Sequence, residues 1–265
     1  MKLQPVTSKR DIALEDEDAR IDLGMSEGEL EAATAKEVER ISELQRVFYA
    51  DARYALLIVL QGRDASGKDG TIRKVFSAVN PQGCSVSSFG VPTPLEQRHD
   101  FLWRIHQQIP PRGMIGIFNR SHYEDVLVTR VHGMIKKKVW TSRYDHINDF
   151  EQMLSESGVV VLKFMLHVSH EEQKKRLQER LDDSEKNWKF RQGDLDDRVL
   201  WNDFTKAYRG VLANTSTKCA PWYIVPADDK DARDWLIART IADRLAKLRL
   251  RYPLADPKLL KLAIE

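Results

Sequence analysis

The chain has 265 residues, of which 42% are hydrophobic and 31% are charged, and its formal net charge is +2. This composition is typical of a folded globular protein and excludes a disordered or fibrous one. No stretch reaches the ~18 to 20 apolar residues of a membrane span, and the first residues lack the apolar core of a secretory signal. We therefore expect a cytoplasmic protein without a membrane partner. The two distant cysteines, Cys84 and Cys219, predict neither a disulfide framework nor a zinc site.

The N-terminal part of the chain divides into an arm and a helix. Residues 1–25 show no regular period and are predicted to form an irregular arm ahead of a single domain over residues 26–265. Ser26 and Glu29 have the spacing of a capping box, in which each side chain bonds the other's backbone N–H. Apolar residues then recur at helical intervals as far as Tyr49, so a long helix is expected to begin at this box.

Four apolar runs follow this helix, and runs of this kind are typical of strands buried on both faces of a parallel sheet. The runs cover residues 54–61, 114–118, 159–168 and 222–225. Helix signals separate them, with capping boxes at Thr93 and Ser169. The expected helices run from 93 to about 109, onward from 169, and over about 232–250. Strands that alternate with helices predict a doubly wound α/β sheet with right-handed crossovers.

The turn between the first apolar run and the next helix has the GxxxxGK spacing of a P-loop. In such a loop, glycines let backbone N–H groups converge on phosphate oxygens, and the lysine adds a mobile charge. The alternative is an ordinary glycine-rich strand-to-helix turn. Lys68 is the predicted catalytic lysine. The predicted phosphate-binding residues of this region are Gly62, Arg63, Ala65, Ser66, Gly67, Asp69, Gly70 and Arg73.

Two carboxylates distinguish this turn from most P-loops. Asp69 stands where a Ser or Thr hydroxyl normally binds Mg²⁺, and Asp64 lies inside the loop. A carboxylate beside a phosphate is repulsive unless a metal ion lies between them. Asp64 is therefore predicted to be a Mg²⁺ ligand or a base for an attacking phosphate. Two interpretations of Asp69 stay open: a residue of the metal's outer shell, or an anion at the helix N-terminus.

Polar residues follow the second apolar run, in the order Asn119, Arg120, Glu124 and Asp125. The carboxyl ends of strands line the ligand crevice of open α/β sheets, so these side chains are expected to face the P-loop. Arg120 offers a bidentate grip on phosphate, and the two acids offer metal contacts. The alternative interpretation places the acids at a helix N-terminus, where they stabilise the helix dipole.

A charged stretch after the third apolar run is a candidate lid over residues 170–195. Arg176 and Arg180 are one helical turn apart, so they can point the same way. Basic side chains that close over phosphates neutralise developing charge and exclude water. A helix rich in Lys, Glu and Arg is otherwise an ordinary solvated surface, and both interpretations stay open at this stage.

Five motifs in sequence order, GRDASGKDG, SFGVPTP, FNRSHYEDVLVTRVH, LQERLDDSEKNWKF and APWYIVPADDK, resemble those of the polyphosphate kinase 2 family over about residues 35–255. The Glu124-Asp125 pair resembles the class III subgroup, whose members accept AMP as well as ADP. The resemblance implies a thymidylate-kinase-like P-loop kinase fold, that is, a three-layer α/β sandwich with a mostly parallel sheet and a helical lid. It also implies Mg²⁺ dependence and assembly as a homodimer or homotetramer.

Site residues follow from the resemblance position by position. The implied catalytic residues are Asp64, Lys68, Arg120, Glu124 and Asp125, of which Asp64 and Asp125 would hold the metal. The implied phosphate-binding residues outside the P-loop are Asn119, Arg176, Arg180, Lys189 and Arg191.

The resemblance implies reversible transfer of a terminal phosphoryl group from inorganic polyphosphate to AMP or ADP. Adenine nucleotides are the expected partners, and guanine nucleotides are left open. Residues 60–149 hold 13 Lys/Arg against 8 Asp/Glu, which suits a polyanion or an ordinary solvated surface. An ATP-dependent nucleoside monophosphate kinase and a non-catalytic nucleotide- or polyanion-binding module are the alternatives. No nucleic-acid motif is found, so nucleic acid is not an expected partner.

Overall fold

The computed structural model describes the whole chain except residues 8–11, 13, 259–261, 263 and 265. Within the described residues, five strands form one sheet in the order β2-β3-β1-β4-β5, and every pairing between them is parallel. The strands are β1 (Ala55–Gly62), β2 (Cys84–Ser88), β3 (Ile115–Asn119), β4 (Val159–His167) and β5 (Trp222–Pro226). The predicted α/β class is confirmed.

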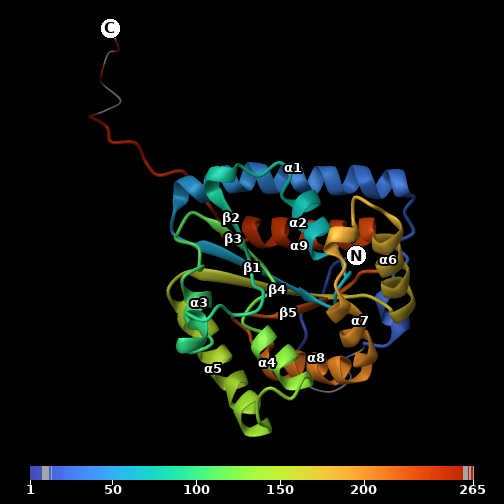
Figure 1. Ribbon diagram of the computed structural model, residues 1–265. Coiled ribbons are helices and arrows are strands. Elements are labelled where there is room, and N and C mark those ends of the chain that lie inside the picture. The colour runs from blue at the N-terminus through green and yellow to red at the C-terminus, as the bar shows by residue number, and fades with distance from the viewer. Residues whose placement is uncertain (8–11, 13, 259–261, 263, 265) are drawn as a thin grey trace.

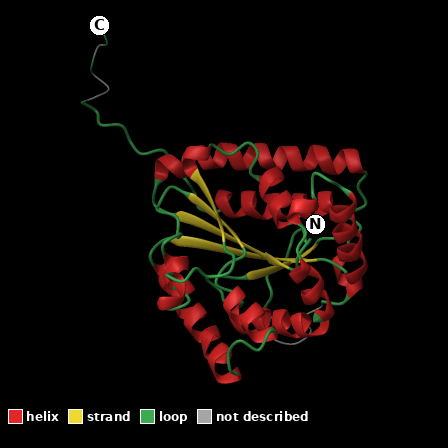
Figure 2. Ribbon diagram, viewed as in Figure 1, coloured by secondary structure: helices red, strands yellow, loops and turns green. Residues whose placement is uncertain are grey.

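Helices cover both faces of the sheet, which makes three layers (Figures 1 and 2). One core packs α1 and α9 against the sheet, and the other packs α4, α5 and α8 against the opposite face. The helices are α1 (Glu27–Asp51), α2 (Lys68–Val75), α3 (Trp103–His106), α4 (Glu124–Val131), α5 (Lys137–Glu156), α6 (His170–Asp182), α7 (Gln192–Val199), α8 (Trp201–Thr215) and α9 (Lys230–Ala246).

The central strand β1 divides the two cores. Leu56 and Ile58 belong to the core with α1 and α9, whereas Leu57 and Val59 belong to the core with α4, α5 and α8, and all four are fully buried. Successive side chains of a strand point to opposite faces, so an uninterrupted apolar run requires cover on both sides. This requirement explains why the run over residues 54–61 predicted a parallel-sheet strand.

Helix α1 begins as its capping box predicts. The Ser26 hydroxyl accepts a hydrogen bond from the Glu29 backbone N–H at 3.4 Å, and the Ser26 N–H donates to the Glu29 carboxylate at 2.8 Å. The described part of the arm before it is mostly irregular. It makes one 3₁₀ turn at Asp16–Ala19 and an isolated antiparallel bridge between Pro5 and Tyr223 of β5.

Over residues 80–110 the sequence missed one strand, and its one helix prediction was wrong. Strand β2 was missed because its sequence CSVSS has neither an apolar run nor much burial: it lies at the edge of the sheet. The helix expected from 93 to 109 is interrupted. Thr93 and Glu96 do bond each other at 2.6 Å and 3.3 Å, but only a 3₁₀ turn, Glu96–Arg98, and the short α3 follow.

None of the described helices combines the length and the apolar character that a membrane crossing requires.

Candidate active site

The carboxyl ends of β1 and β3 meet at one edge of the sheet, where the P-loop lies. Gly62 ends β1, and the loop runs directly into α2, which begins at Lys68. Leu60 of β1 pairs with Asn119 of β3, so the polar segment after β3 starts beside the loop. This is the edge at which ligands bind in open α/β sheets.

Close backbone approach explains two glycines of the loop. Gly67 has a φ of +103°, and a Cβ at this position would lie 2.0 Å from the Arg233 guanidinium. A Cβ at Gly62 would lie 2.6 Å from a carbonyl oxygen of β4. Arg233 pairs with Asp234 at 2.8 Å, and Asp234 accepts a hydrogen bond from Thr71 of α2 at 2.6 Å. This support of the loop by α9 was not predicted, because no motif indicates it.

Lys68 is folded back onto its own loop. Its Nζ donates to the carbonyl oxygens of Gly62 at 2.8 Å and of Arg63 at 3.1 Å, and the residue is only 8% exposed. Burial, assisted by the positive charge of Arg120, lowers the pKa of Lys68 to about 8. A phosphate bound in the loop would replace these two carbonyl oxygens as the hydrogen-bond acceptor of Lys68. It would bind the ammonium more strongly, because phosphate is anionic.

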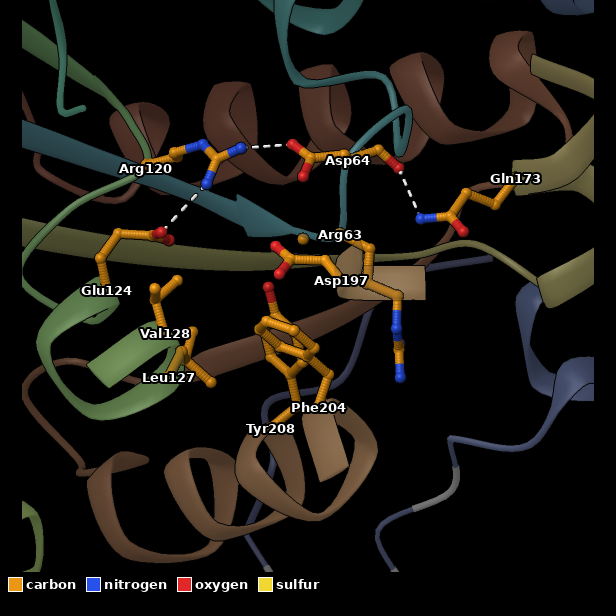
Figure 3. A pocket seen from close by; sticks show the side chains of 11 residues that line it. Arg63, Asp64, Arg120, Glu124, Leu127, Val128, Gln173, Asp197, Phe204 and Tyr208 are labelled. Carbon is orange, nitrogen blue, oxygen red and sulfur yellow. Dashed lines mark hydrogen bonds and ion pairs between the residues drawn. The ribbon is translucent and has the colours of Figure 1, made fainter. Parts of the chain in front are cut away.

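Arg120 links two carboxylates across the mouth of the loop (Figure 3). Its guanidinium bonds Asp64 through Nη2 and Glu124 through Nη1, the latter at 3.0 Å. Burial alone would lower the pKa of Arg120, but Glu124 and Asp64 outweigh it and raise this pKa. Arg120 also has a φ of +62°, and a side-chain-bearing residue in this conformation is strained, as is common at functional sites. The structure thus brings together three of the predicted catalytic side chains.

The other predicted residues of this region lie in the loop, in α2 and at the end of β3. Asn119 donates to the Asp69 carboxylate at 2.6 Å, which joins the end of β3 to the first turn of α2. Ser66 is fully buried, and Ala65 has a φ of +61°. Gly70 lies in the first turn of α2, and Arg73, further along that helix, is exposed.

Arg63 differs from its predicted role. Its guanidinium lies 3.7 Å from the ring centroid of Trp201 and donates to Trp201 O at 3.1 Å and to Thr205 Oγ1 at 2.5 Å. Burial lowers the pKa of Arg63 to about 10. The side chain therefore ties the P-loop to α8, because its hydrogen bonds are made to that helix.

Asp125 also lies elsewhere than predicted. Its carboxylate is 3.4 Å from Arg143 of α5 and 3.7 Å from Arg104 of α3, and its Oδ2 is buried without a hydrogen-bond partner. Burial raises the pKa of Asp125 against the opposing effect of both arginines. Glu124, one residue earlier in the first turn of α4, is the acid that lies beside Asp64. Both acids are indeed at a helix N-terminus, as the alternative interpretation had it.

The arginines of the candidate lid have protein partners. Arg176 donates to the carbonyl oxygens of Ala65 at 3.1 Å and of Ala227 and Asp228 at 2.7 Å, and its side chain is 7% exposed. It braces the P-loop rather than facing the crevice. Arg180 pairs with Asp194 of α7 at 3.3 Å.

Lys189 and Arg191 lie between α6 and α7. Lys189 belongs to the 3₁₀ turn Asn187–Lys189, and Arg191 precedes α7 and is exposed. Within the described residues, neither side chain pairs with a carboxylate, although the Lys189 ammonium lies 5.1 Å from the ring centroid of Trp188. These two cations are the lid residues best placed to meet an anion.

A pocket opens beside the ion pairs of Arg120 (Figure 3). Its apolar wall comes from α4 and α8, and its polar wall comes from the loop, the turn after β3, the start of α4, α6 and α7. The lining side chains beyond the loop are Arg120, Glu124, Leu127, Val128, Gln173, Asp197, Phe204 and Tyr208. The residues from α7 and α8 were missed, because no motif marks them and they lie far along the chain from the loop.

The metal question depends on the carboxylates near the loop. Asp64, Asp69 and Glu124 supply hard oxygen atoms, which are the ligands Mg²⁺ prefers. Among the residues that the structure describes, however, no ready-made cluster of three His, Cys, Asp or Glu side chains is present. A cation here would therefore take much of its coordination from substrate phosphates and water, as Mg²⁺ commonly does.

A parallel α/β sheet, a lysine-bearing glycine loop at its carboxyl edge and an arginine held between two acids together define a P-loop phosphotransferase. Comparison with known proteins narrows this class. The family model described as polyphosphate kinase 2 matches residues 24–252. The chain belongs to the polyphosphate kinase 2 family.

Relatives and solved structures agree with this assignment. The chain is 51% identical over 226 residues to the AMP/ADP-polyphosphate phosphotransferase of Meiothermus ruber, with 85% of each chain covered. It is 46% identical over 233 residues to the ADP-polyphosphate phosphotransferase of Rhodopseudomonas palustris, covering 83% of this chain and 81% of the relative. The crystal structure of polyphosphate kinase 2 from Arthrobacter aurescens TC1 superposes with a TM-score of 0.84 at 38% identity, covering 96% of this chain and 95% of that one.

Proposed function

We propose that this protein transfers the terminal phosphoryl group of inorganic polyphosphate to AMP or ADP. The observation that carries the proposal is the chain of ion pairs from Asp64 through Arg120 to Glu124, beside a P-loop lysine, in a member of the polyphosphate kinase 2 family. The names of the Meiothermus and Rhodopseudomonas relatives support both acceptors. The Glu124-Asp125 pair supports AMP in addition to ADP.

The reaction is an in-line displacement. An oxygen of the acceptor's terminal phosphate attacks the last phosphorus of polyphosphate, and the bond from that phosphorus to the bridging oxygen breaks, so polyphosphate becomes one unit shorter. Such a transfer needs positioning and charge neutralisation rather than covalent catalysis. Lys68 and the loop N–H groups bind phosphates, and Arg120 neutralises the group that moves.

Asp64 and Glu124 are the residues that would hold Mg²⁺, because both border the pocket and both offer carboxylate oxygens. Asp125 was the predicted second ligand, but its contacts with Arg104 and Arg143 make Glu124 the better candidate. A bound Mg²⁺ supplies neutralisation of phosphate charge. Chelation of divalent cations should therefore stop turnover, and added Mg²⁺ should restore it.

Incubation of the protein with polyphosphate, Mg²⁺ and either AMP or ADP, without ATP, tests the proposal. Chromatography should show ADP and ATP formed from AMP, and ATP formed from ADP. The Lys68→Ala variant should be inactive, whereas Lys74→Ala, on the exposed side of the same helix, should be unaffected. Turnover that requires ATP as donor would instead identify a nucleoside monophosphate kinase, and binding without turnover would identify a binding module.

Four further properties are part of the proposal. These are the use of guanine nucleotides, assembly as a homodimer or homotetramer, the cytoplasmic location, and a single domain over residues 26–265 whose part around 170–195 acts as a lid.

A further inference from the structure

A charged pair is buried directly beneath the turn that carries Arg120 and Glu124. Lys163 lies in the middle of β4, and Glu151 faces it from α5. Their Nζ and Oε2 atoms are 2.5 Å apart, and both residues are 0% exposed. No step of the proposed reaction uses either residue.

The charged groups of this pair are fully hydrogen-bonded. The Lys163 ammonium donates to Glu151, to Tyr123 Oη at 2.7 Å and to Thr215 O at 2.7 Å, which uses all three of its N–H groups. Tyr123 Oη donates in turn to Glu151 Oε1 at 2.8 Å. Burial alone would raise the pKa of Glu151, but Lys163 and His122 lower it, so the carboxylate is ionised. Four elements thus meet at one point: β4, α5, α8 and the turn after β3.

Stability alone does not explain such an arrangement. Taking two charges out of water costs so much that apolar residues of similar volume often stabilise a fold equally well or better. Apolar residues, however, do not fix the orientation of neighbouring groups. The hydrophobic effect is non-directional, whereas hydrogen bonds fix distances and angles. A saturated ion pair therefore suits a place where geometry matters more than stability.

The turn above the pair is such a place. His122 and Tyr123 lie between Arg120 and Glu124, whose side chains form an ion pair with each other across the turn. His122 Nε2 is 3.3 Å from Glu151 Oε1, and the Tyr123 ring packs edge-on against Trp222 at 4.7 Å. His122 and Tyr123 are therefore held by the buried cluster, while Arg120 and Glu124 at the two ends of the turn face the pocket.

We propose that Lys163, Glu151 and Tyr123 are positioning residues, which hold the turn over residues 120–124 so that Arg120 and Glu124 meet the transferring phosphate. This inference rests on the proposed function for its catalytic consequence. It predicts an effect on kcat, because misplacement of reacting groups by ~1 Å can cost about a hundredfold in rate. Substrate binding by the P-loop, which the pair does not touch, should persist.

The test replaces the polar set with apolar residues of similar volume, in the triple variant Lys163→Met, Glu151→Leu and Tyr123→Phe. We expect a folded protein whose melting temperature is close to the native value, with kcat lowered about a hundredfold and KM for polyphosphate changed less than about threefold. A folded triple variant with native kcat would overturn the inference.

The single variant Tyr123→Phe covers the case in which the triple variant does not fold, because it keeps the ion pair. We expect kcat to fall about tenfold at unchanged KM. Its matched control is Tyr144→Phe, which removes another buried hydroxyl, bonded to Arg130 at 3.2 Å, that does not touch the turn. Equal small effects of both substitutions would contradict a positioning role.

Hydrogen exchange separates this inference from the proposed function. The backbone amides of residues 120–124 should exchange faster in the variants than in the native protein, while the P-loop amides are unchanged. If the native protein fails to use polyphosphate, the proposed function is wrong, yet this exchange result still decides the positioning role. Unchanged exchange in the turn would refute it.

Discussion

Helix α6 and the connection between α6 and α7 use their basic residues differently. In α6, the Arg176 side chain is 7% exposed and donates its N–H groups to carbonyl oxygens of the P-loop and of the segment after β5. In the connection, Trp188 is 75% exposed, and Lys189 and Arg191 have no carboxylate partner within the described residues. A motif rich in arginine and lysine thus contains both braces and free cations, and only burial and hydrogen-bond partners distinguish them.

The largest effect should come from the cations at the loop itself. Lys68→Ala and Arg120→Ala should each lower kcat by about a thousandfold or more, because each removes charge that faces the transferred group. Their melting temperatures should stay near the native value, since neither side chain supports the core. Steady-state kinetics and thermal unfolding of the same preparations check this expectation. Native turnover by Lys68→Ala would refute the mechanism.

Substitution of Arg176 should lower both stability and turnover. Arg176→Ala removes the donor from three carbonyl oxygens, two of them in buried hydrogen bonds, so we expect the free energy of unfolding to fall by about 2 to 4 kcal/mol. Turnover should fall as well, because the loop loses support. Denaturant unfolding measures the first effect. A variant that keeps native stability but binds polyphosphate weakly would show that Arg176 is a ligand contact instead.

The pH dependence should reflect the buried Lys68. Its pKa of about 8 lies below its ordinary value of 10.5, so the free protein loses the charge as pH rises through 8. The value of kcat/KM, which reports the free enzyme, should therefore fall about tenfold between pH 7.5 and pH 9. The unfolded chain binds more protons than the folded chain between pH 8 and 10.5, so this group makes stability rise with pH in that window. A flat kcat/KM profile across pH 7.5 to 9 would contradict the lowered pKa.

Substitution of Lys189 or Arg191 should give the smallest effect. Arg191→Ala and Lys189→Ala should each raise KM for polyphosphate by about threefold, with kcat and melting temperature nearly unchanged. Because exposed charges are screened, the difference from the native protein should shrink as salt is added. Titration of polyphosphate at low and high salt measures it. Loss of stability in either variant would show that the connection between α6 and α7 also supports the fold.

The sequence predicts the four strands that carry an apolar run, including the partly buried edge strand β5, and misses β2. Residues 54–61 are readily predicted as a strand, because the apolar run is nearly continuous and ends before Gly62. The edge strand β2 carries mostly serine and leaves no comparable signal. A capping box at Thr93 marks a real turn, but it does not show that the helix ends after one turn.

The sequence likewise predicts one part of the candidate site and misses another. Spacing and strand position are enough to place Arg120 and Glu124 near the P-loop, because the ends of neighbouring parallel strands meet. They do not show which way a side chain points, so the contacts of Arg63 with α8 and of Asp125 with two arginines were not foreseeable. Pocket residues from α7 and α8 depend entirely on the tertiary fold.

The most direct test of the account compares two phosphoryl donors under one condition. With AMP as acceptor and Mg²⁺ present, kcat/KM is measured for polyphosphate and for ATP. The account predicts that polyphosphate is the better donor by at least about tenfold, and that Arg120→Ala removes this activity. Equal or better use of ATP would contradict it and would favour a nucleoside monophosphate kinase.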